Sequence, residues 1–228
     1  MNNEGFSNVH ADNTISVALR LKTLIYHIIK RTFDIICAII GIIALLPLAV
    51  IIKISYLLTG DKESIFFIQK RIGINGKEFD FYKFRTMIPN ADEELAKLLK
   101  KDKKLAKEYK INKKLENDPR ITKAGNFLRR TSLDEMPQFI NVLLGDMSVV
   151  GNRPYLPREK EDMGNYFDDI VKTKPGLTGY WQVSGRSDVS FKRRLELEKY
   201  YSNHCGLKMD IKIFFKTFKV VFCGNDAR

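Results

Sequence analysis

The sequence DPRITKAGNFLRRTSLDEMPQFINVLLGDMSVVGNRP, residues 118–154, carries the pattern around which the rest of the chain is arranged. At its centre stand two adjacent carboxylates, Asp134 and Glu135, preceded by Arg129 and Arg130. Neighbouring acids are stable together only when a proton, a metal ion or another cation is shared between them. Arginines supply donors that suit phosphate oxygens. The pattern therefore indicates phosphoryl transfer, with one carboxylate as nucleophile and the other on a metal ion.

The same residues also fit the start of a helix. Ser132 stands at the N-cap and Glu135 at the third helical position of a capping box, and Pro137 precedes the regular hydrogen bonds of the helix. Apolar residues would continue the helix until Gly145 ends it, namely Phe139, Ile140, Val142, Leu143 and Leu144. The pattern alone leaves both interpretations open, because the start of a helix also binds anions.

Composition limits the remaining possibilities. A chain of 228 residues can hold one moderate domain plus an appendage. Its net charge of +12 favours an anionic partner: nucleic acid, a phospholipid surface or a phosphorylated substrate. Cys37, Cys205 and Cys223 lack the spacing of a disulfide framework or a zinc site and suit a reducing cytoplasm. The phosphate-binding motifs of common ATPases and dehydrogenases are missing from the sequence.

The N-terminal part of the chain predicts contact with a membrane. Residues 1–13 are polar and are expected to lack regular structure. From about Ser16 apolar residues recur at helical spacing with basic residues between them, as in a basic amphipathic helix. Residues 35–52 then form a run of 18 residues without a charge. That length is the short limit for crossing a bilayer of about 30 Å as one helix.

Pro47 interrupts this run. Proline has no N–H and its ring obstructs the carbonyl of Ile43, so a bend is predicted there. Basic residues flank the run on both sides, which predicts that both ends stay on the cytoplasmic side. A re-entrant hairpin, which enters one leaflet and returns, satisfies both observations. A helix that spans the membrane and a buried helix of a soluble protein are the alternatives.

Later segments predict a helix-rich domain with a small β-hairpin. Residues 64–87 read as a hairpin around Asn75 and Gly76. Residues 90–114 read as a lysine-rich helix whose charges face solvent or anionic lipid headgroups. Further helices are predicted at residues 157–172, 191–201 and 207–222, with a glycine-rich loop at 174–186 in which Gly176, Gly179 and Gly185 permit close backbone approach.

The predicted organisation has three parts. Residues 1–33 form a polar N-terminus and basic amphipathic helix, residues 34–53 a re-entrant membrane hairpin, and residues 54–228 a cytoplasmic catalytic domain. The predicted fold class is accordingly mixed α/β, a helix-rich cytoplasmic domain with a small β-hairpin, anchored by the N-terminal membrane hairpin.

Further motifs accompany the central stretch: FIQKRIG at residues 67–73, YKFRTM at 82–87 and KPGLTGYWQVSGR at 174–186. Together with DPRIT, FLRRTSLDEMPQFINVLLGDMSVVG and RP, these motifs closely resemble the bacterial sugar transferases. These are monotopic phosphoglycosyl transferases, here in their short form, that load a sugar phosphate onto a polyprenyl phosphate carrier. The resemblance runs from about Lys30 to Thr217.

The resemblance implies a specific reaction. A sugar 1-phosphate would pass from a nucleotide diphosphate sugar, a UDP-sugar, to undecaprenyl phosphate through a covalent aspartyl phosphosugar, with release of nucleoside monophosphate. This would be the first membrane step of an exopolysaccharide, capsule, lipopolysaccharide or other glycoconjugate pathway, at the cytoplasmic face of the membrane. Asp134 would be the nucleophile, and Glu135 with Asp134 would hold Mg²⁺. The implied substrate-binding residues are Lys70, Arg71, Lys83, Arg85, Arg129, Arg130, Arg153, Gln182 and Arg186.

The chain departs from the family pattern at three positions. Leu46 stands where relatives often have Ser before the proline, Asn152 where they commonly have Pro, and Glu198 where many have Asp. Two other classes of protein compete with the transferase: a basic protein that binds the membrane surface, and a nucleic-acid binder. The apolar run and the absence of a nucleic-acid motif in the sequence disfavour the latter. The sugar, the pathway and the oligomeric state stay open.

Overall fold

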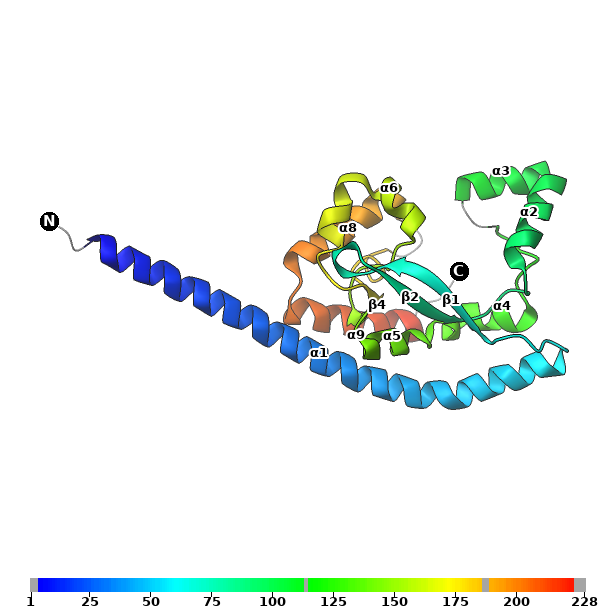
Figure 1. Ribbon diagram of the computed structural model, residues 1–228, viewed down its shortest axis with the longest axis horizontal. Helices are drawn as coiled ribbons and strands as arrows, with labels where there is room; N and C mark the ends of the chain where they lie inside the picture. Colours follow the sequence, from blue (N-terminus) through cyan, green and yellow to red (C-terminus); the bar gives the residue numbers. More distant parts are fainter. Residues whose placement is uncertain (1–3, 113–114, 186–188, 224–228) are drawn as a thin grey trace.

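The computed structural model describes residues 4–112, 115–185 and 189–223. One very long helix, α1 (Glu4–Leu58), runs beneath a domain of shorter helices and two small sheets (Figure 1). Residues 34–53, predicted as a re-entrant hairpin, lie inside this helix, which contains Pro47 and curves without reversing direction (Figure 1). A turn at Pro47 is therefore not confirmed. The segment from Glu4 to Asn13, expected to be loose, is helical as well.

The predicted β-hairpin is confirmed. Strands β1 (Phe66–Ile72) and β2 (Glu78–Phe84) pair antiparallel, and the short helix η1 (Ile74–Gly76) joins them. Asn75 and Gly76 have φ angles of 56° and 75°, the left-handed conformation that an Asn-Gly turn favours. The pairing runs from Phe66 opposite Phe84 to Ile72 opposite Glu78.

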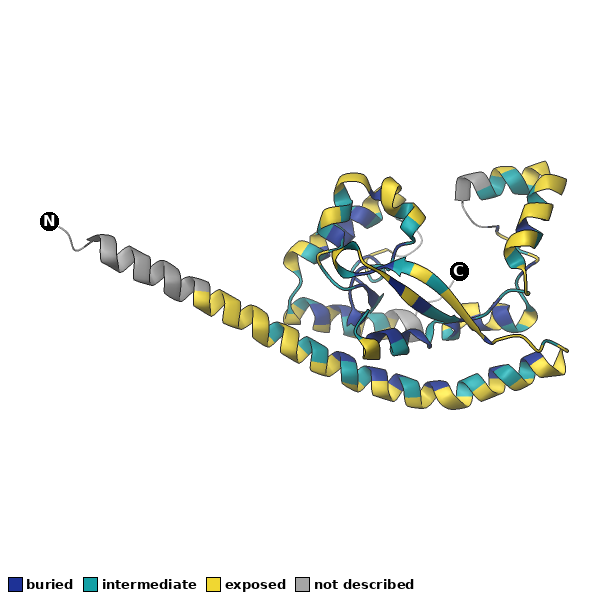
Figure 2. Ribbon diagram, viewed as in Figure 1, coloured by how far each residue is buried: buried dark blue, intermediate teal, exposed yellow. Residues whose placement is uncertain are grey.

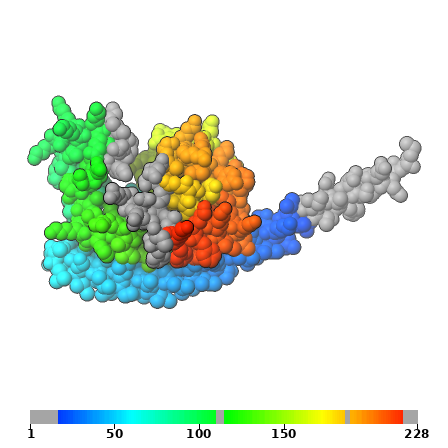
Figure 3. Space-filling model, turned by 180° about the vertical axis from the view of Figure 1, so that it is seen from behind, coloured from blue at the N-terminus to red at the C-terminus, as the bar shows by residue number. Residues whose placement is uncertain are grey.

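The lysine-rich segment forms two helices where the sequence predicted one. Helix α2 (Ala91–Lys101) ends at Asp102, which has an extended backbone with φ −124° and ψ 109°. The Asp102 Oδ1 accepts a hydrogen bond from the backbone N–H of Lys104, 2.7 Å away, and so starts helix α3 (Lys103–Asn112) anew. The pair of helices stands apart from the body of the domain (Figure 3).

The central segment corrects the predicted capping box. After helix α4 (Lys123–Arg130) the chain makes a short 3₁₀ turn, η2 (Leu133–Glu135), and helix α5 begins only at Gln138 (Gln138–Leu144). Ser132 has a φ of 57°, and its side chain makes no capping hydrogen bond. A left-handed residue cannot aim its hydroxyl at the N–H groups of the next turn as an extended N-cap does. Gly145, with φ 93°, ends α5 as predicted.

A second sheet was not predicted. Strands β3 (Ser148–Val150) and β4 (Gly176–Thr178) pair parallel and bring the two ends of residues 148–178 together. The glycine-rich loop makes this approach possible, because a Cβ at Gly176 would lie 2.1 Å from the backbone nitrogen of Gly151. The expected role of Gly176 in close backbone approach is therefore confirmed.

The C-terminal third is helical. The single helix predicted at residues 157–172 is instead a series of short pieces, because Gly164 at φ 50° interrupts it. The two predicted C-terminal helices are confirmed. The elements are η3 (Pro157–Glu159), α6 (Lys160–Met163), η4 (Gly164–Tyr166), α7 (Phe167–Ile170), α8 (Phe191–His204) and α9 (Leu207–Cys223).

Helix α1 contributes directly to the core of the domain. Its Ala38 belongs to a buried cluster with residues of the hairpin, α5, β3, α8 and α9, and its Leu45 and Ile52 belong to a second cluster with Phe84 and Leu128. Figure 2 shows these buried positions along the inner side of the helix. The opposite side of α1 is apolar and exposed: Ile36, Ile40, Ile43, Leu46, Val50, Ile51 and Ile54.

Gly41 sets how closely α1 packs on α5. A Cβ at this position would lie 2.4 Å from the ring of Phe139, so only glycine allows the contact. By length and composition, residues Val17–Leu58 of α1 could cross a membrane. This long apolar helix fits association with a membrane.

Candidate active site

The two central carboxylates lie on the 3₁₀ turn η2, between α4 and α5. Asp134 is buried, with 9% of its surface exposed. Lys83, next to the last residue of β2, reaches both acids: its Nζ lies 2.8 Å from Glu135 Oε1 and 3.8 Å from Asp134 Oδ2. The structure therefore has the shared cation that adjacent carboxylates require, and the hairpin supplies it.

Their surroundings shift the pKa values of the two acids in opposite directions. Burial raises the pKa of Asp134 above its ordinary value, although the Lys83 ammonium acts against this. Burial also acts to raise the pKa of Glu135, but the ion pair and hydrogen bond with Lys83 outweigh it, and the pKa of Glu135 is lowered. Acids whose pKa values are pushed apart are suited to different chemical roles. Asp134 is the more basic carboxylate, and Glu135 is the one held in its charged form.

A cleft of about 370 Å³, partly open to solvent, lies against Glu135. It joins parts of the chain that are far apart in the sequence, because the hairpin forms one wall and the parallel strand pair another. Its cations Arg71, Lys83 and Arg153 face one acidic side chain, Glu135, so the cleft is suited to an anion. The lining residues are Arg71, Phe81, Lys83, Glu135, Gln138, Arg153, Pro154, Gly176, Leu177 and Gln182.

Arg153 is held by the residues around its backbone. The N–H of Arg153 donates a hydrogen bond to Glu198 Oε1, 3.0 Å away. The buried side chain of Asn152 donates to the carbonyl of Ile170 at 3.1 Å and to the hydroxyl of Ser202 at 2.6 Å. Both positions at which the chain departs from the family pattern in this region thus take part in holding the turn.

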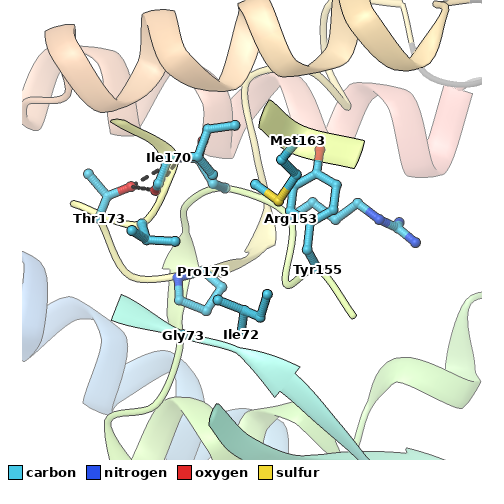
Figure 4. A pocket seen from close by; sticks show the side chains of 10 residues that line it. Ile72, Gly73, Arg153, Tyr155, Met163, Ile170, Thr173 and Pro175 are labelled. Carbon is cyan, nitrogen blue, oxygen red and sulfur yellow. Dashed lines mark hydrogen bonds between the residues drawn. The ribbon is translucent and has the colours of Figure 1, made fainter. Parts of the chain in front are cut away.

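A small, mostly apolar cavity lies behind this turn (Figure 4). Met163, Ile170 and Pro175 surround it, and the guanidinium of Arg153 points away from them. Two arginines lie over the ring of Trp181, with ring-to-guanidinium distances of 6.0 Å for Arg153 and 4.5 Å for Arg194. Stacking on an aromatic face limits the freedom of an arginine without neutralising its charge.

Glu198 is fully buried in α8. Burial raises its pKa to about 7, against the opposing effects of Tyr155, the Arg153 N–H and the arginine charges. Its second oxygen, Oε2, has no hydrogen bond of good geometry within the described part of the chain. An ionisable group in such a place is costly to charge, so Glu198 changes protonation state near neutral pH.

Two other predicted site residues, Arg129 and Arg130, are not among those that line the cleft. Arg129 donates from Nε to the hydroxyl of Thr86 at 2.9 Å, and its charge helps to lower the pKa of Asp134. Arg130 is exposed at the end of α4. Arg186 lies outside the described residues.

The structure does not bring Lys70 and Arg85 into the cleft. Side chains alternate along a strand, so Lys70 and Arg71 point to opposite faces, and Lys70 pairs with Asp80 at 2.8 Å. Arg85 donates to both oxygens of Asp61 at 2.9 Å and ties the end of the hairpin to the loop after α1.

Gln138 was missed by the sequence analysis. It is 2% exposed, it lines the cleft, and its Nε2 has no hydrogen-bond partner of good geometry among the described residues. Gln138 follows Asp134 by four residues, a spacing that places two side chains on one face of a helix, and this could have indicated that Gln138 lies near the site. In the part of the chain that the structure describes, no cluster of three or more Asp, Glu, His or Cys side chains could hold a metal ion.

Comparison with known proteins adds to this geometry. The family model described as bacterial sugar transferase matches residues 25–224. The chain is 46% identical over 199 residues to a protein of Salmonella typhimurium named undecaprenyl-phosphate galactose phosphotransferase, covering 87% of this chain and 41% of that protein. It is 41% identical over 192 residues to the exopolysaccharide production protein ExoY of Sinorhizobium fredii, covering 84% of both chains.

A third relative is named for both of its substrates. The UDP-glucose:undecaprenyl-phosphate glucose-1-phosphate transferase of Escherichia coli is 35% identical over 209 residues, which cover 88% of this chain and 41% of that protein. The chain thus spans about two fifths of the length of the Salmonella and Escherichia relatives and most of the length of the Sinorhizobium one.

Proposed function

The chain belongs to the bacterial sugar transferase family, and on that premise we propose that it transfers a sugar 1-phosphate from a UDP-sugar to undecaprenyl phosphate. The observation that carries the proposal is the cleft, in which Arg71, Lys83 and Arg153 converge on Glu135 beside the buried Asp134. A diphosphate is the kind of anion that such a cleft accommodates. The names of the Salmonella and Escherichia relatives supply the donor and acceptor classes.

The proposed reaction has two steps. An oxygen of the Asp134 carboxylate attacks the phosphorus that bears the sugar, and the bond from that phosphorus to the nucleoside monophosphate breaks. The nucleoside monophosphate leaves, and an aspartyl phosphosugar is formed. A phosphate oxygen of undecaprenyl phosphate then attacks the same phosphorus, and Asp134 leaves as a carboxylate. The product is undecaprenyl diphosphate sugar.

The residues of the cleft suit the charges of this route. The elevated pKa of Asp134 makes it the more nucleophilic carboxylate, and Lys83 lies close enough to both acids to balance charge. Arg71 and Arg153 can bear the phosphate oxygens. The two steps also avoid bringing two anionic substrates together in one transition state.

The family resemblance implies Mg²⁺. The donor set fits this ion, which takes one or two protein carboxylates and completes its shell with water and substrate phosphate oxygens. Asp134 and Glu135 would hold it, and when bound it would neutralise phosphate charge.

We also propose that α1 holds the protein at the cytoplasmic face of the membrane. Its outer side is apolar and exposed, whereas its inner side contacts the catalytic domain from Tyr26 to Tyr56. A helix that contacts one soluble domain near both ends of its apolar run cannot place those ends on opposite sides of a bilayer. These contacts support a position within one leaflet. The lysines of α2 and α3 would add contacts with anionic headgroups.

The test is release of nucleoside monophosphate by the purified protein from a panel of UDP-sugars, with and without undecaprenyl phosphate. We expect one sugar to give a stoichiometric burst without the acceptor and turnover with it. Release that requires the acceptor would indicate direct transfer. Absence of release from every UDP-sugar, in protein whose fold is verified, would leave a basic membrane-binding protein as the better description.

A further inference from the structure

Helix α1 carries three charged side chains within little more than one turn, and all three contact the catalytic domain. The sequence predicted Lys30 and Arg31 as basic flanks of a membrane segment, but the structure places both of them, together with Asp34, in hydrogen bonds with backbone groups of α5 and β3. We call these three residues the polar clamp. They lie just before the apolar run of residues 35–52.

The first contact of the polar clamp is with the end of α5. The Arg31 guanidinium donates to the carbonyl of Val142 at 2.6 Å and to that of Leu143 at 2.7 Å. These carbonyls belong to the last turn of the helix, where the orphaned acceptors favour a cation. The first residue of the same helix, Gln138, lines the cleft three positions after Glu135. Arg31 therefore holds the far end of the helix that follows the turn carrying the two carboxylates.

The second contact is with β3. The buried carboxylate of Asp34 accepts hydrogen bonds through Oδ1 from the Ser148 hydroxyl at 2.9 Å and from the Val149 N–H at 2.8 Å. The Lys30 ammonium donates to the Val150 carbonyl at 2.8 Å. Both ends of β3 are thus held by α1. Arg153 follows the strand by three residues.

A part-buried network of hydrogen bonds fixes the position of Lys30. Its Nζ lies 2.6 Å from Asp210 Oδ2, which also accepts from the Tyr26 hydroxyl at 2.9 Å. Asp210 Oδ1 accepts from the Tyr201 hydroxyl at 2.8 Å. Lys30 is consequently paired on one side with a carboxylate of α9 and on the other with the strand. Its position has little freedom, because each group has its partner in a part-buried place.

We propose that the polar clamp is a positioning element of the active site, which fixes α5 and β3 relative to each other and so sets the position of Arg153 relative to Asp134 and Glu135. This inference rests on the proposed function. The membrane helix then has a second role besides attachment. Displacements of about 1 Å at a reacting centre can cost about a hundredfold in rate, so loss of the polar clamp should slow the chemical step.

The test compares Lys30→Met with Lys53→Met in detergent micelles. Lys53 is a matched control, because it lies on the same helix and also donates to two backbone carbonyls, those of Lys62 and Glu63, but away from the cleft. The measured quantity is the single-turnover rate constant for nucleoside monophosphate release, with enzyme in excess over UDP-sugar and undecaprenyl phosphate present. While folded enzyme stays in saturating excess, partial misfolding leaves this rate constant unchanged, whereas altered geometry lowers it.

We expect Lys30→Met to lower the rate constant at least about tenfold, with Lys53→Met unchanged. Asp34→Leu should match Lys30→Met, and Asp34→Asn, which keeps the accepting oxygen, should retain most of the rate. Where Asp34→Leu does not fold, Arg31→Met provides the second variant, since its side chain is only partly buried.

Two outcomes separate the inference from the proposed function. If the unmodified protein releases nucleoside monophosphate and Lys30→Met, Arg31→Met and Lys53→Met all share its rate constant, the polar clamp does not position the site. If the unmodified protein releases none, the proposed function fails, and hydrogen exchange at residues 134–154 still tests whether Lys30→Met loosens these elements. Exchange that is equal in Lys30→Met and Lys53→Met would also overturn the inference.

Discussion

Lys83 and Glu135 form an ion pair, with 2.8 Å between Nζ and Oε1, that joins the β-hairpin to the turn carrying the two carboxylates. The same ammonium lies 3.8 Å from Asp134 Oδ2. This lysine opposes the rise that burial causes in the pKa of Asp134 and lowers the pKa of Glu135, and so keeps two adjacent carboxylates compatible.

Replacing Lys83 by Met should therefore reduce kcat/KM by about a hundredfold. Without the ammonium the pKa of Asp134 rises further, so the acid side of the pH–rate profile should move to higher pH. Steady-state kinetics between pH 5 and 9 measure both effects. Lys70→Met is the control, since Lys70 pairs with Asp80 outside the cleft on the neighbouring strand. Equal losses in the two variants would argue against a specific role for Lys83.

Asp134→Asn should lower turnover by at least about a thousandfold and remove covalent labelling by a UDP-sugar, because an amide is a poor nucleophile. Intact-mass measurement after incubation with the sugar nucleotide detects the adduct. Asp80→Asn should label normally. Ser132→Ala should also label normally and lose little stability, since Ser132 makes no capping bond. Normal turnover in Asp134→Asn would remove this residue from the mechanism.

Glu198→Gln should change how stability depends on pH. In the folded protein Glu198 holds its proton up to about pH 7, whereas the unfolded side chain releases it near its ordinary pKa of 4.5. The folded state therefore binds the extra proton between these values, and its stability falls as pH rises through about 7. Glutamine does not titrate and still accepts from the Arg153 N–H.

Relative to Glu198→Gln, the unmodified protein should lose up to roughly 3 kcal/mol of unfolding free energy between pH 5 and pH 8. Thermal unfolding in one detergent at both pH values measures the difference. Glu196→Gln is the matched control, because Glu196 lies on the same helix and pairs with the largely exposed side chain of Arg193. A difference between the unmodified protein and Glu198→Gln that does not vary with pH would show that Glu198 is charged throughout.

Cysteines introduced at Asn13 and Lys62 should both react with a membrane-impermeant thiol reagent only from the cytoplasmic side. The background lacks Cys37, Cys205 and Cys223. The expectation follows from the contacts that α1 makes with one domain near Lys30 and near Tyr56. Labelling of the Asn13 position from outside intact cells would show that α1 spans the membrane.

Removal of divalent cations should abolish turnover, and Mg²⁺ should restore it. Glu135→Gln removes one of the two proposed carboxylate ligands, so it should raise the Mg²⁺ concentration needed for half-maximal rate by about tenfold or more. Titration of the rate with Mg²⁺ checks this. Full activity in the presence of a chelator would exclude a metal requirement.

Elements with strong local signals were predictable from the sequence. The Asn75-Gly76 turn predicted the hairpin, and apolar spacing predicted α8 and α9. The parallel pair of β3 and β4 was not, because each strand has three residues and its partner lies more than twenty residues away. The break at Asp102 was not predicted, because the apolar repeat continues through it and gives no sign that one helix ends and another begins there.

The chemistry of the site was easier to predict from the sequence than its geometry. Asp134, Glu135 and the arginines stand out as residue types, and the family resemblance added Lys83 and Gln182. The set of basic residues that line the cleft depends on the alternation of side chains along a strand and on long-range pairing. The sequence alone therefore did not show that Arg71 and Lys83 line the cleft whereas Lys70 and Arg85 do not. The predicted capping box is wrong, because Ser132 has a left-handed backbone conformation that no local sequence pattern indicates.

The burial of Ala38, Leu45 and Ile52 in the core bears on any attempt to make a soluble form of this protein. Cutting the chain after residue 53 would remove these three side chains and expose the surfaces they cover. Burial of a large aliphatic side chain contributes about 1.5–3 kcal/mol, and a whole domain is stable by only about 5–15 kcal/mol. Truncation would therefore forfeit much of the folding free energy along with the proposed contact with lipid, so detergent or nanodisc preparations of the intact chain are the material for biochemical work.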